Sequence, residues 1–137
     1  MSEENKIMSG ETDLSKLIKE MKPELNLGEF VFCVTDSGNH PLFADAICHF
    51  QEAEGTTMIL SKQKADQAKL PYSGTYAWIT LTVHSSLEAV GLTSAVSKAL
   101  ADANISCNMV AAYYHDHIFV PIQDAKRAMD ALLQLTK

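Results

Sequence analysis

The chain has 137 residues, of which 47% are hydrophobic, and a formal net charge of −6 with Arg127 as its sole arginine. This length fits one ordinary domain or two very small ones, and the acidic balance argues against nucleic acid or acidic membrane partners. The N-terminus has no apolar signal core, and no apolar run approaches the roughly 18 residues of a membrane span, so we expect a cytoplasmic protein.

The first half of the chain is predicted to hold a short helix, three strands and a second helix. Apolar residues recur at helical spacing over 14–21, with Thr12 or Asp13 as the cap and Pro23 as the stop. A polar loop at 36–41 and a turn at Glu54-Gly55 separate the three predicted strands, and a linker follows the second helix. The predicted elements are strands at 30–34, about 43–52 and 56–60, a helix capped by Ser61 and running through Ala68, and a linker at 69–75.

The second half is predicted to run strand, helix, strand, strand, helix. Its first strand alternates, with Ile79 and Leu81 on an apolar face and Trp78 and Thr80 on the other. Asn104 is the predicted C-cap of the first helix. The predicted elements are a strand at 76–83, a helix at 92–103, a strand from 105 to about 113, a turn at 114–116, a strand at 117–122 and a final helix at 125–135.

This order predicts an α+β ferredoxin-like sandwich, with an antiparallel sheet and helices on one face. A repeat is visible at an offset of about 60 residues, because Met58-Ile59-Leu60 aligns with Ile118-Phe119-Val120 and the alanines and glutamine that follow align as well. The first copy is incomplete, since residues 34–43 leave no room for a crossover helix. We therefore expect strands to be exchanged between the halves, with either 30–34 or 76–83 filling an edge of the neighbouring unit.

Three runs in the second half resemble a known family. They are Gly91-Leu92-Thr93, Asn104-Ile105-Ser106-Cys107-Asn108 and His115-Asp116-His117-Ile118-Phe119-Val120-Pro121. Together they resemble the small tandem ACT-like proteins of bacteria, which are related to the regulatory ACT domains of the aspartokinase type. The resemblance implies tandem ACT-like βαββαβ units, with a degenerate copy at 1–70 and an ACT domain at 71–137. The acidic residue and the proline that the family places near its glycine are replaced here by His84 and Val90.

The turn before the second-half helix is the candidate ligand site. Free N–H groups in a first helical turn favour a carboxylate, and Gly91 lets a backbone approach closely. The resemblance implies an amino acid held at the interface of two paired units, and it carries the site to His84, Ser85, Val90, Gly91, Leu92, Ile105, Ser106 and Asn108. Alternatively, Gly91 only relieves crowding between helix and sheet. In the first half, loop 36–40 is the candidate for a second pocket.

Metal and catalytic sites are not expected. The turn at 115–117 pairs two histidines and His84 adds a third, but no cysteine or carboxylate cluster completes a metal site. No orienting acid supports nucleophilic catalysis at His84-Ser85-Ser86. The three cysteines, Cys33, Cys48 and Cys107, lack metal spacing and are interpreted as buried free thiols. We expect no catalytic residue, no metal and no cofactor.

The sequence thus favours a non-enzymatic regulatory or sensor module that binds a small amino acid as a homodimer and acts on a separate enzyme. One alternative is a structural interaction module, in which the loop is collapsed and the open sheet face bearing Trp78 and Thr80 docks a protein partner. A weaker alternative is a small enzyme that uses His84 or the turn at 115–117.

Overall fold

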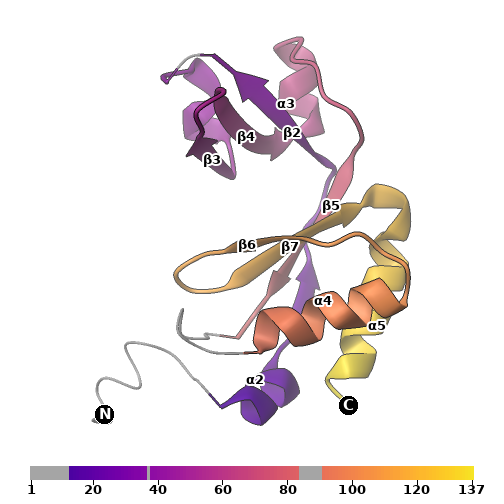
Figure 1. Ribbon diagram of the computed structural model, residues 1–137. Coiled ribbons are helices and arrows are strands. Elements are labelled where there is room, and N and C mark those ends of the chain that lie inside the picture. Colours follow the sequence, from indigo (N-terminus) through magenta and orange to yellow (C-terminus); the bar gives the residue numbers. More distant parts are fainter. Residues whose placement is uncertain (1–12, 37, 84–90) are drawn as a thin grey trace, which may run out of the picture. The chain divides into compact units, whose positions relative to one another are not determined.

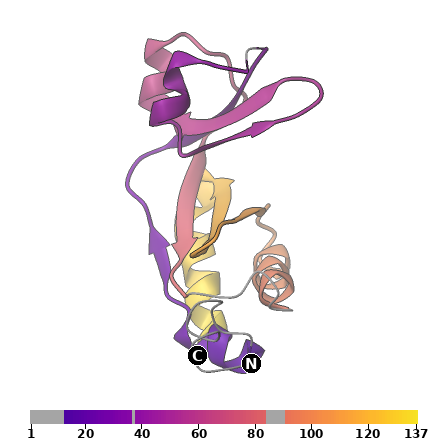
Figure 2. The ribbon, with the colours of Figure 1, turned by 90° about the vertical axis from the view of Figure 1, so that its left-hand side faces the viewer.

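The computed structural model describes residues 13–36, 38–83 and 91–137 (Figures 1 and 2). The chain divides into two compact units, of which unit 1 comprises Met1–Asn26 and Trp78–Lys137 and unit 2 comprises Leu27–Ala77. Strand β5, Tyr76–Leu81, crosses this boundary along the chain, because its first two residues belong to unit 2 and its last four to unit 1. The boundary predicted between residues 70 and 71 separates the two copies of the sequence repeat. The two units of the structure are instead defined by which residues are in contact, so their boundaries differ.

Unit 1 has the ferredoxin-like strand order that the sequence predicts, β1-β5-β7-β6. Its strands and helices are α2 (Leu14–Glu20), β1 (Pro23–Leu25), the end of β5, α4 (Leu92–Asp102), β6 (Asn108–Ala111), β7 (Asp116–Pro121), the 3-10 turn η2 (Ile122–Asp124) and α5 (Ala125–Leu135). Glu24 of β1 lies opposite Thr80 of β5 in an antiparallel pair. In the β6–β7 hairpin, Val110 lies opposite His117. The N-terminal β1 thereby supplies the edge strand beside β5.

The core of unit 1 lies between its sheet and its helices. Alternation along β5 buries Ile79 and Leu81 completely, because side chains point to opposite faces at successive positions of a strand. Leu100 of α4 and Leu132 of α5 are also fully buried, and the two helices pack against each other (Figure 1). Both helices have 11 residues, and within the described ranges no helix has the length and apolar character of a membrane span.

Unit 2 has the corresponding strand order, β3-β4-β2, with Tyr76 at the start of β5 opposite Phe30 of β2. Its elements are β2 (Phe30–Thr35), the 3-10 helix η1 (Pro41–Asp45), β3 (Cys48–Gln51), β4 (Thr56–Ser61) and α3 (Lys62–Gln67). The buried cluster is Val31, Cys33, Met58, Leu60 and Ala65, against which Leu42, Phe43, Ala46, Leu70 and Tyr72 pack. Connecting segments therefore complete this core.

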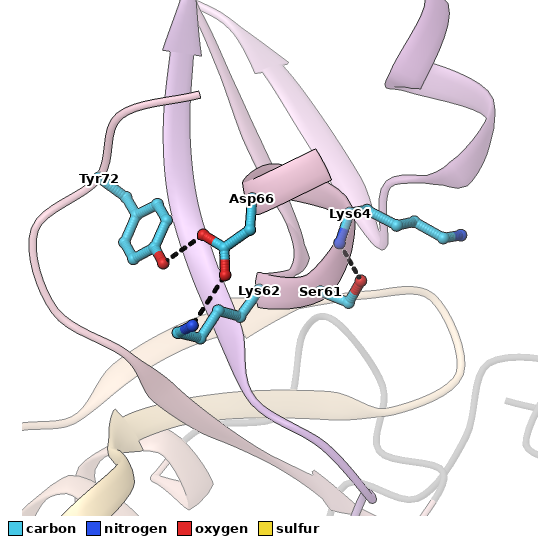
Figure 3. A network of polar contacts seen from close by, with 5 residues as sticks. All are labelled: Ser61, Lys62, Lys64, Asp66 and Tyr72. Atoms are coloured by element: carbon cyan, nitrogen blue, oxygen red, sulfur yellow. Dashed lines mark hydrogen bonds and ion pairs between the residues drawn. The ribbon is translucent and has the colours of Figure 1, made fainter. Parts of the chain in front are cut away.

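A polar network on α3 holds the segment that follows the helix (Figure 3). The Asp66 carboxylate accepts hydrogen bonds from Lys62 Nζ at 2.8 Å and from the Tyr72 hydroxyl at 2.6 Å. Ser61 is the N-cap, and its hydroxyl accepts from the Lys64 N–H at 3.2 Å, as the sequence predicts. The network attaches the predicted linker to the helix of its own unit.

Several predicted boundaries are confirmed and several are wrong. The helix capped by Asp13 is confirmed, and Asn104 follows the C-cap of α4 with a left-handed φ of 59°. The strands predicted at 43–52 and 105–113 are shorter, since they form only at Cys48–Gln51 and Asn108–Ala111. Pro23 does stop a helix, but it also begins β1, which the sequence analysis missed. The edge of unit 1 is filled by β1, which neither predicted segment anticipated. The predicted strand at 76–83 does reach the edge of unit 2, since Tyr76 lies opposite Phe30 of β2.

Candidate functional site

Gly91 forms the turn into α4 with a backbone conformation that favours glycine. It is the N-cap of the helix with a left-handed φ of 99°, and it makes no side-chain capping bond. Its carbonyl accepts from the Ala95 N–H at 2.8 Å, which is the first helical bond. Leu92, the first helical residue, is buried. The predicted site residues His84, Ser85 and Val90 lie outside the described residues.

Leu14 of α2 packs directly onto this glycine. A Cβ atom at position 91 would lie 2.8 Å from Leu14 Cδ2, closer than non-bonded carbon atoms approach, so the end of the Leu14 side chain would have to shift. The same helix anchors itself in the core through Leu17, which is fully buried, and through its Asp13 cap, which accepts from the Lys16 N–H at 3.0 Å. The close approach of α2 is thus one physical reason for glycine at this position.

The other predicted ligand contacts lie at the opposite end of α4. Ile105 is buried, and its N–H donates to the Leu100 carbonyl at 2.9 Å, so the chain reverses there. Ser106 is exposed, and Asn108 begins β6 with its side-chain amide donating to the Phe119 carbonyl at 3.2 Å. A cavity of about 480 Å³ is lined by Ala101, Asn104, Ile105, Ser106, Pro121 and Asp124.

The length of α4 separates these two groups of residues within one chain. Its 11 residues span roughly 16 Å at 1.5 Å per residue. Gly91 and Leu92 lie at one end, whereas Ile105 and Ser106 follow the other. The structure therefore does not bring all predicted residues into one pocket of a single chain, and their joint role stays a prediction that requires a second copy.

The sole arginine is bonded to Asp124, which lines the cavity at the end of α4, and the sequence analysis did not foresee this contact. Arg127 Nη1 donates to Asp124 Oδ1 at 2.8 Å, and Nη2 donates to the Ala103 carbonyl. Because a helix C-terminus leaves carbonyls without helical partners, the guanidinium compensates one of them. The Asp124 carboxylate therefore lines the same cavity as Ser106, with the guanidinium bonded to it.

A hydrogen-bonded cluster on the sheet of unit 1 joins residues that the sequence left apart. His117 Nδ1 lies 3.0 Å from Trp78 Nε1 and 3.1 Å from Thr80 Oγ1. Asn26, which the sequence analysis missed, donates to Thr80 Oγ1 at 3.0 Å. The alternation of Trp78 and Thr80 was the available signal, since it predicts that both face away from the apolar side of β5. Neighbouring His115 Nδ1 lies 3.5 Å from the Val83 carbonyl.

The titratable groups described here fit a structural role. Burial, followed by the neighbouring His115, lowers the pKa of His117, and Asp116 opposes this effect. Burial also raises the pKa values of the three free cysteines, Cys33, Cys48 and Cys107, which keeps these thiols protonated and poorly nucleophilic. Among the described residues, no three histidine, cysteine or carboxylate side chains gather as a metal site.

Two family models of the ACT domain match the chain in tandem, at residues 9–77 and 73–134. The chain belongs to the ACT-domain family. A Vibrio cholerae protein described as of unknown function and as a possible transport protein shares 44% identity, with a TM-score of 0.82 over 90% of this chain and 96% of its own. No curated protein matches the chain.

More distant structures share the ACT fold at low sequence identity. The Agrobacterium tumefaciens protein Atu0741 has 16% identity and a TM-score of 0.72, covering 85% of this chain and 89% of its own. The ligand-free regulatory subunit of Thermus thermophilus aspartate kinase has 12% identity and a TM-score of 0.58, covering 84% of this chain and 97% of its own. The tandem ACT match and this shared fold support a regulatory module.

Proposed function

We propose that this tandem ACT protein is a non-enzymatic, cytoplasmic regulatory module that binds a small amino acid where two ACT units pair. The C-terminal copy, residues 71–137, is the ligand-binding one, and the copy at 1–70 is degenerate. The protein acts as a homodimer and passes its signal to a separate enzyme, because a binding event has an effect only through a coupled equilibrium.

The observation that carries the proposal is the strand-to-helix turn at Gly91. Gly91 has a φ of 99° and, as a glycine, carries no side chain that could cap the first turn of this 11-residue helix. A ligand carboxylate suits that position, because the N–H groups and the helix dipole both favour negative charge. Family membership adds weight, since the turn occupies the position of the ACT glycine.

The second half of the proposed site comes from another copy. In unit 1, β6 is an edge strand, and an edge strand offers backbone groups for pairing with another chain. Pairing along β6 would carry Ser106 and Asn108 of one copy toward its partner. Because the two predicted groups lie at opposite ends of α4, ligand binding and dimer formation are linked, and each strengthens the other.

A thermal-shift screen against the twenty amino acids tests the proposal. A ligand that binds only the folded protein adds about 2.7 kcal/mol at 100 times its dissociation constant. We expect one or two amino acids to raise the melting temperature, and light scattering to show more dimer in their presence. A flat response to all twenty, with no change in mass, would refute amino-acid binding.

Two serines provide a matched pair of variants for the same screen. Ser106→Ala removes an exposed hydroxyl at the predicted site, and we expect it to weaken the response. Ser97→Ala removes a hydroxyl from the middle of α4, where it donates to the Ser94 carbonyl at 3.2 Å. This control should leave the response unchanged. Equal effects of the two variants would place the ligand elsewhere.

The packing of Leu14 against Gly91 favours a second candidate function, a structural interaction module without a small-molecule ligand. If glycine is required only to admit α2, the turn needs no ligand. This candidate predicts no response to any amino acid and association with a protein partner through the open sheet face. Thr80 is buried, so Trp78, which is half-buried on the same face, is the residue to replace. Its replacement would then weaken partner association without changing the amino-acid screen.

A further inference from the structure

The chain leaves unit 1 at Asn26 and re-enters it at Trp78, and these two residues are bonded to each other. The Asn26 N–H donates to the Trp78 carbonyl at 2.9 Å, and the Asn26 side-chain amide approaches the same carbonyl at 3.2 Å. That amide also donates to Thr80 Oγ1 at 3.0 Å. The end of β1 is therefore fastened to β5 by side chains as well as by the sheet ladder.

His117 of β7 completes this cluster as an acceptor. Trp78 Nε1–H can only donate, so the bond of 3.0 Å requires His117 Nδ1 to carry a lone pair. Thr80 Oγ1 accepts from Asn26, which leaves its own hydrogen to donate toward the same Nδ1 at 3.1 Å. The imidazole is thus neutral, with its proton on Nε2. A protonated imidazole would present an N–H to the indole N–H, whereas the Thr80 hydroxyl could reverse its role and accept.

We propose that Asn26, Trp78, Thr80 and His117 form a pH-responsive clasp between β1, β5 and β7 of unit 1. Neutral His117 holds the Trp78 indole and the Thr80 hydroxyl. Protonation of Nδ1 sets donor against donor at the Trp78 indole, which must turn away. The Thr80 hydroxyl must turn its own hydrogen aside and accept from both His117 and Asn26, so the two compete for one oxygen. The clasp does not rest on the proposed amino-acid site.

The charges around His117 set the direction of the response. On its own strand, His115 disfavours the imidazolium and Asp116 favours it. From β6, the residue opposite His117 is the uncharged Val110. From β5 the facing groups are those of the clasp, and beyond them Glu24 of β1 lies opposite Thr80.

Burial is the largest cause that lowers the pKa of His117 below its usual value near 6.5. A histidine with a lowered pKa stabilises the fold in its neutral form. That contribution is present above the unfolded pKa of about 6.5, and it is lost as the pH falls through the folded value. The clasp is therefore closed at neutral pH and opens in mild acid.

The single tryptophan of the chain is Trp78, so the indole reports on the clasp directly. We would titrate the wild-type protein between pH 8 and pH 5 and follow both the indole Nε1–H and the His117 ring by NMR. We expect both signals to move with one shared midpoint below about 6.5. An indole signal that stays constant, or that follows a different midpoint from the His117 ring, would overturn the proposal.

His117→Asn separates titration from hydrogen bonding. The asparagine Oδ1 takes the place of Nδ1 as an acceptor and has no proton to gain in this range. We expect the pH dependence of tryptophan fluorescence to disappear in this variant. His49→Asn is the control, because it removes an exposed histidine of β3 in unit 2 and should keep the wild-type response. A full response in His117→Asn would contradict the clasp, and if that variant fails to fold, the wild-type NMR titration decides alone.

Discussion

Units 1 and 2 repeat the same strand order with very different helices. The crossover between β5 and β6 contains α4 with 11 residues, whereas the crossover between β2 and β3 contains only the five-residue η1. The second helices differ in the same way, because α5 has 11 residues and α3 has six. The hairpin strands β4 and β7 nevertheless have identical burial patterns. The sheet preserves the repeat, and the helices are the variable part.

The difference changes what each core is made from. In unit 1, long helices contribute buried residues such as Leu100 and Leu132, whereas α3 contributes only Ala65 to the core of unit 2. Loop and linker residues fill the remaining space there, among them Phe43 and Tyr72. Unit 2 should therefore depend less on its helix than unit 1 does.

The largest expected effect on the free energy of unfolding comes from α5 and tests how far unit 1 depends on its helices. Leu132→Ala empties a fully buried position and should lower the free energy of unfolding by about 2–5 kcal/mol. Ala65→Gly, the corresponding weakening of α3, should cost only about 1 kcal/mol. Urea unfolding followed by circular dichroism measures both variants.

Leu133→Ala is the matched control for this comparison. Leu133 is its neighbour on α5 but 47% exposed, so its removal should change stability by less than about 0.5 kcal/mol. Equal costs for the two leucine variants, or a cost at Ala65 as large as that at Leu132, would show that the helices do not distinguish the two units.

Periodicity and caps predicted the long elements of unit 1 because the relevant signals are local. Apolar spacing and the Asn104 cap fix α4, and the alternation of Ile79 and Leu81 fixes β5. The sequence did not predict β1. Three residues beginning with proline carry too little periodicity, and this strand forms only because β5 offers it an edge.

The site was predictable only where backbone conformation determines the residue type. Gly91 stands out in the sequence because few other residues adopt its positive φ. Leu14 packs on that glycine although the two residues lie 77 positions apart in the sequence (91 minus 14), so no local pattern indicates the contact. The same holds for Asn26 and His117, which meet through their contacts with Trp78 and Thr80.

A smaller effect on stability is expected from replacing Gly91, in the turn before α4, and Gly38, in the corresponding loop before η1. Gly91→Ala forces alanine into a φ of 99° and toward Leu14, and the backbone conformation alone should cost about 1–3 kcal/mol. Gly38→Ala, in the loop before η1, meets nothing within 4 Å and should be neutral or stabilising by up to about 1 kcal/mol. Thermal unfolding of both variants makes the comparison.

The double variant Leu14→Ala with Gly91→Ala divides the cost into two parts. Removing Leu14 relieves the contact of 2.8 Å but leaves the backbone strain. We expect partial recovery relative to Gly91→Ala measured in the Leu14→Ala background. Complete recovery would show that crowding alone selects glycine, and no recovery would show that the positive φ alone does.

The short helices of the two units should respond equally to the loss of their caps. Asp13 accepts from the Lys16 N–H and Ser61 from the Lys64 N–H, each three residues ahead. Asp13→Ala and Ser61→Ala should each cost about 1 kcal/mol in urea unfolding. Ser97→Ala, within α4, is the control that caps nothing. A much larger loss at one cap would mean that its unit depends on that helix more than its length suggests.

The smallest effect concerns the exposed network on α3, in which Tyr72 adds a second partner to Asp66, whereas the contact described for Asp130 of α5 is its ion pair with Lys126. Hydrogen bonds from Lys62 and then from Tyr72 lower the pKa of Asp66. A lowered carboxyl pKa stabilises the fold above its unfolded value, and that contribution is lost as the pH falls through the folded value.

The melting temperature of the wild type should therefore fall more steeply on acidification below about pH 4 than that of Asp66→Asn. The difference should be slight, because the Asp66 side chain is 47% exposed and solvent screens its ion pair with Lys62. Asp130→Asn breaks an ion pair of the same spacing and should follow the wild-type curve more closely. If both variants flatten the curve equally, the bond to Tyr72 adds nothing, and the linker of unit 2 is held by its apolar contacts alone.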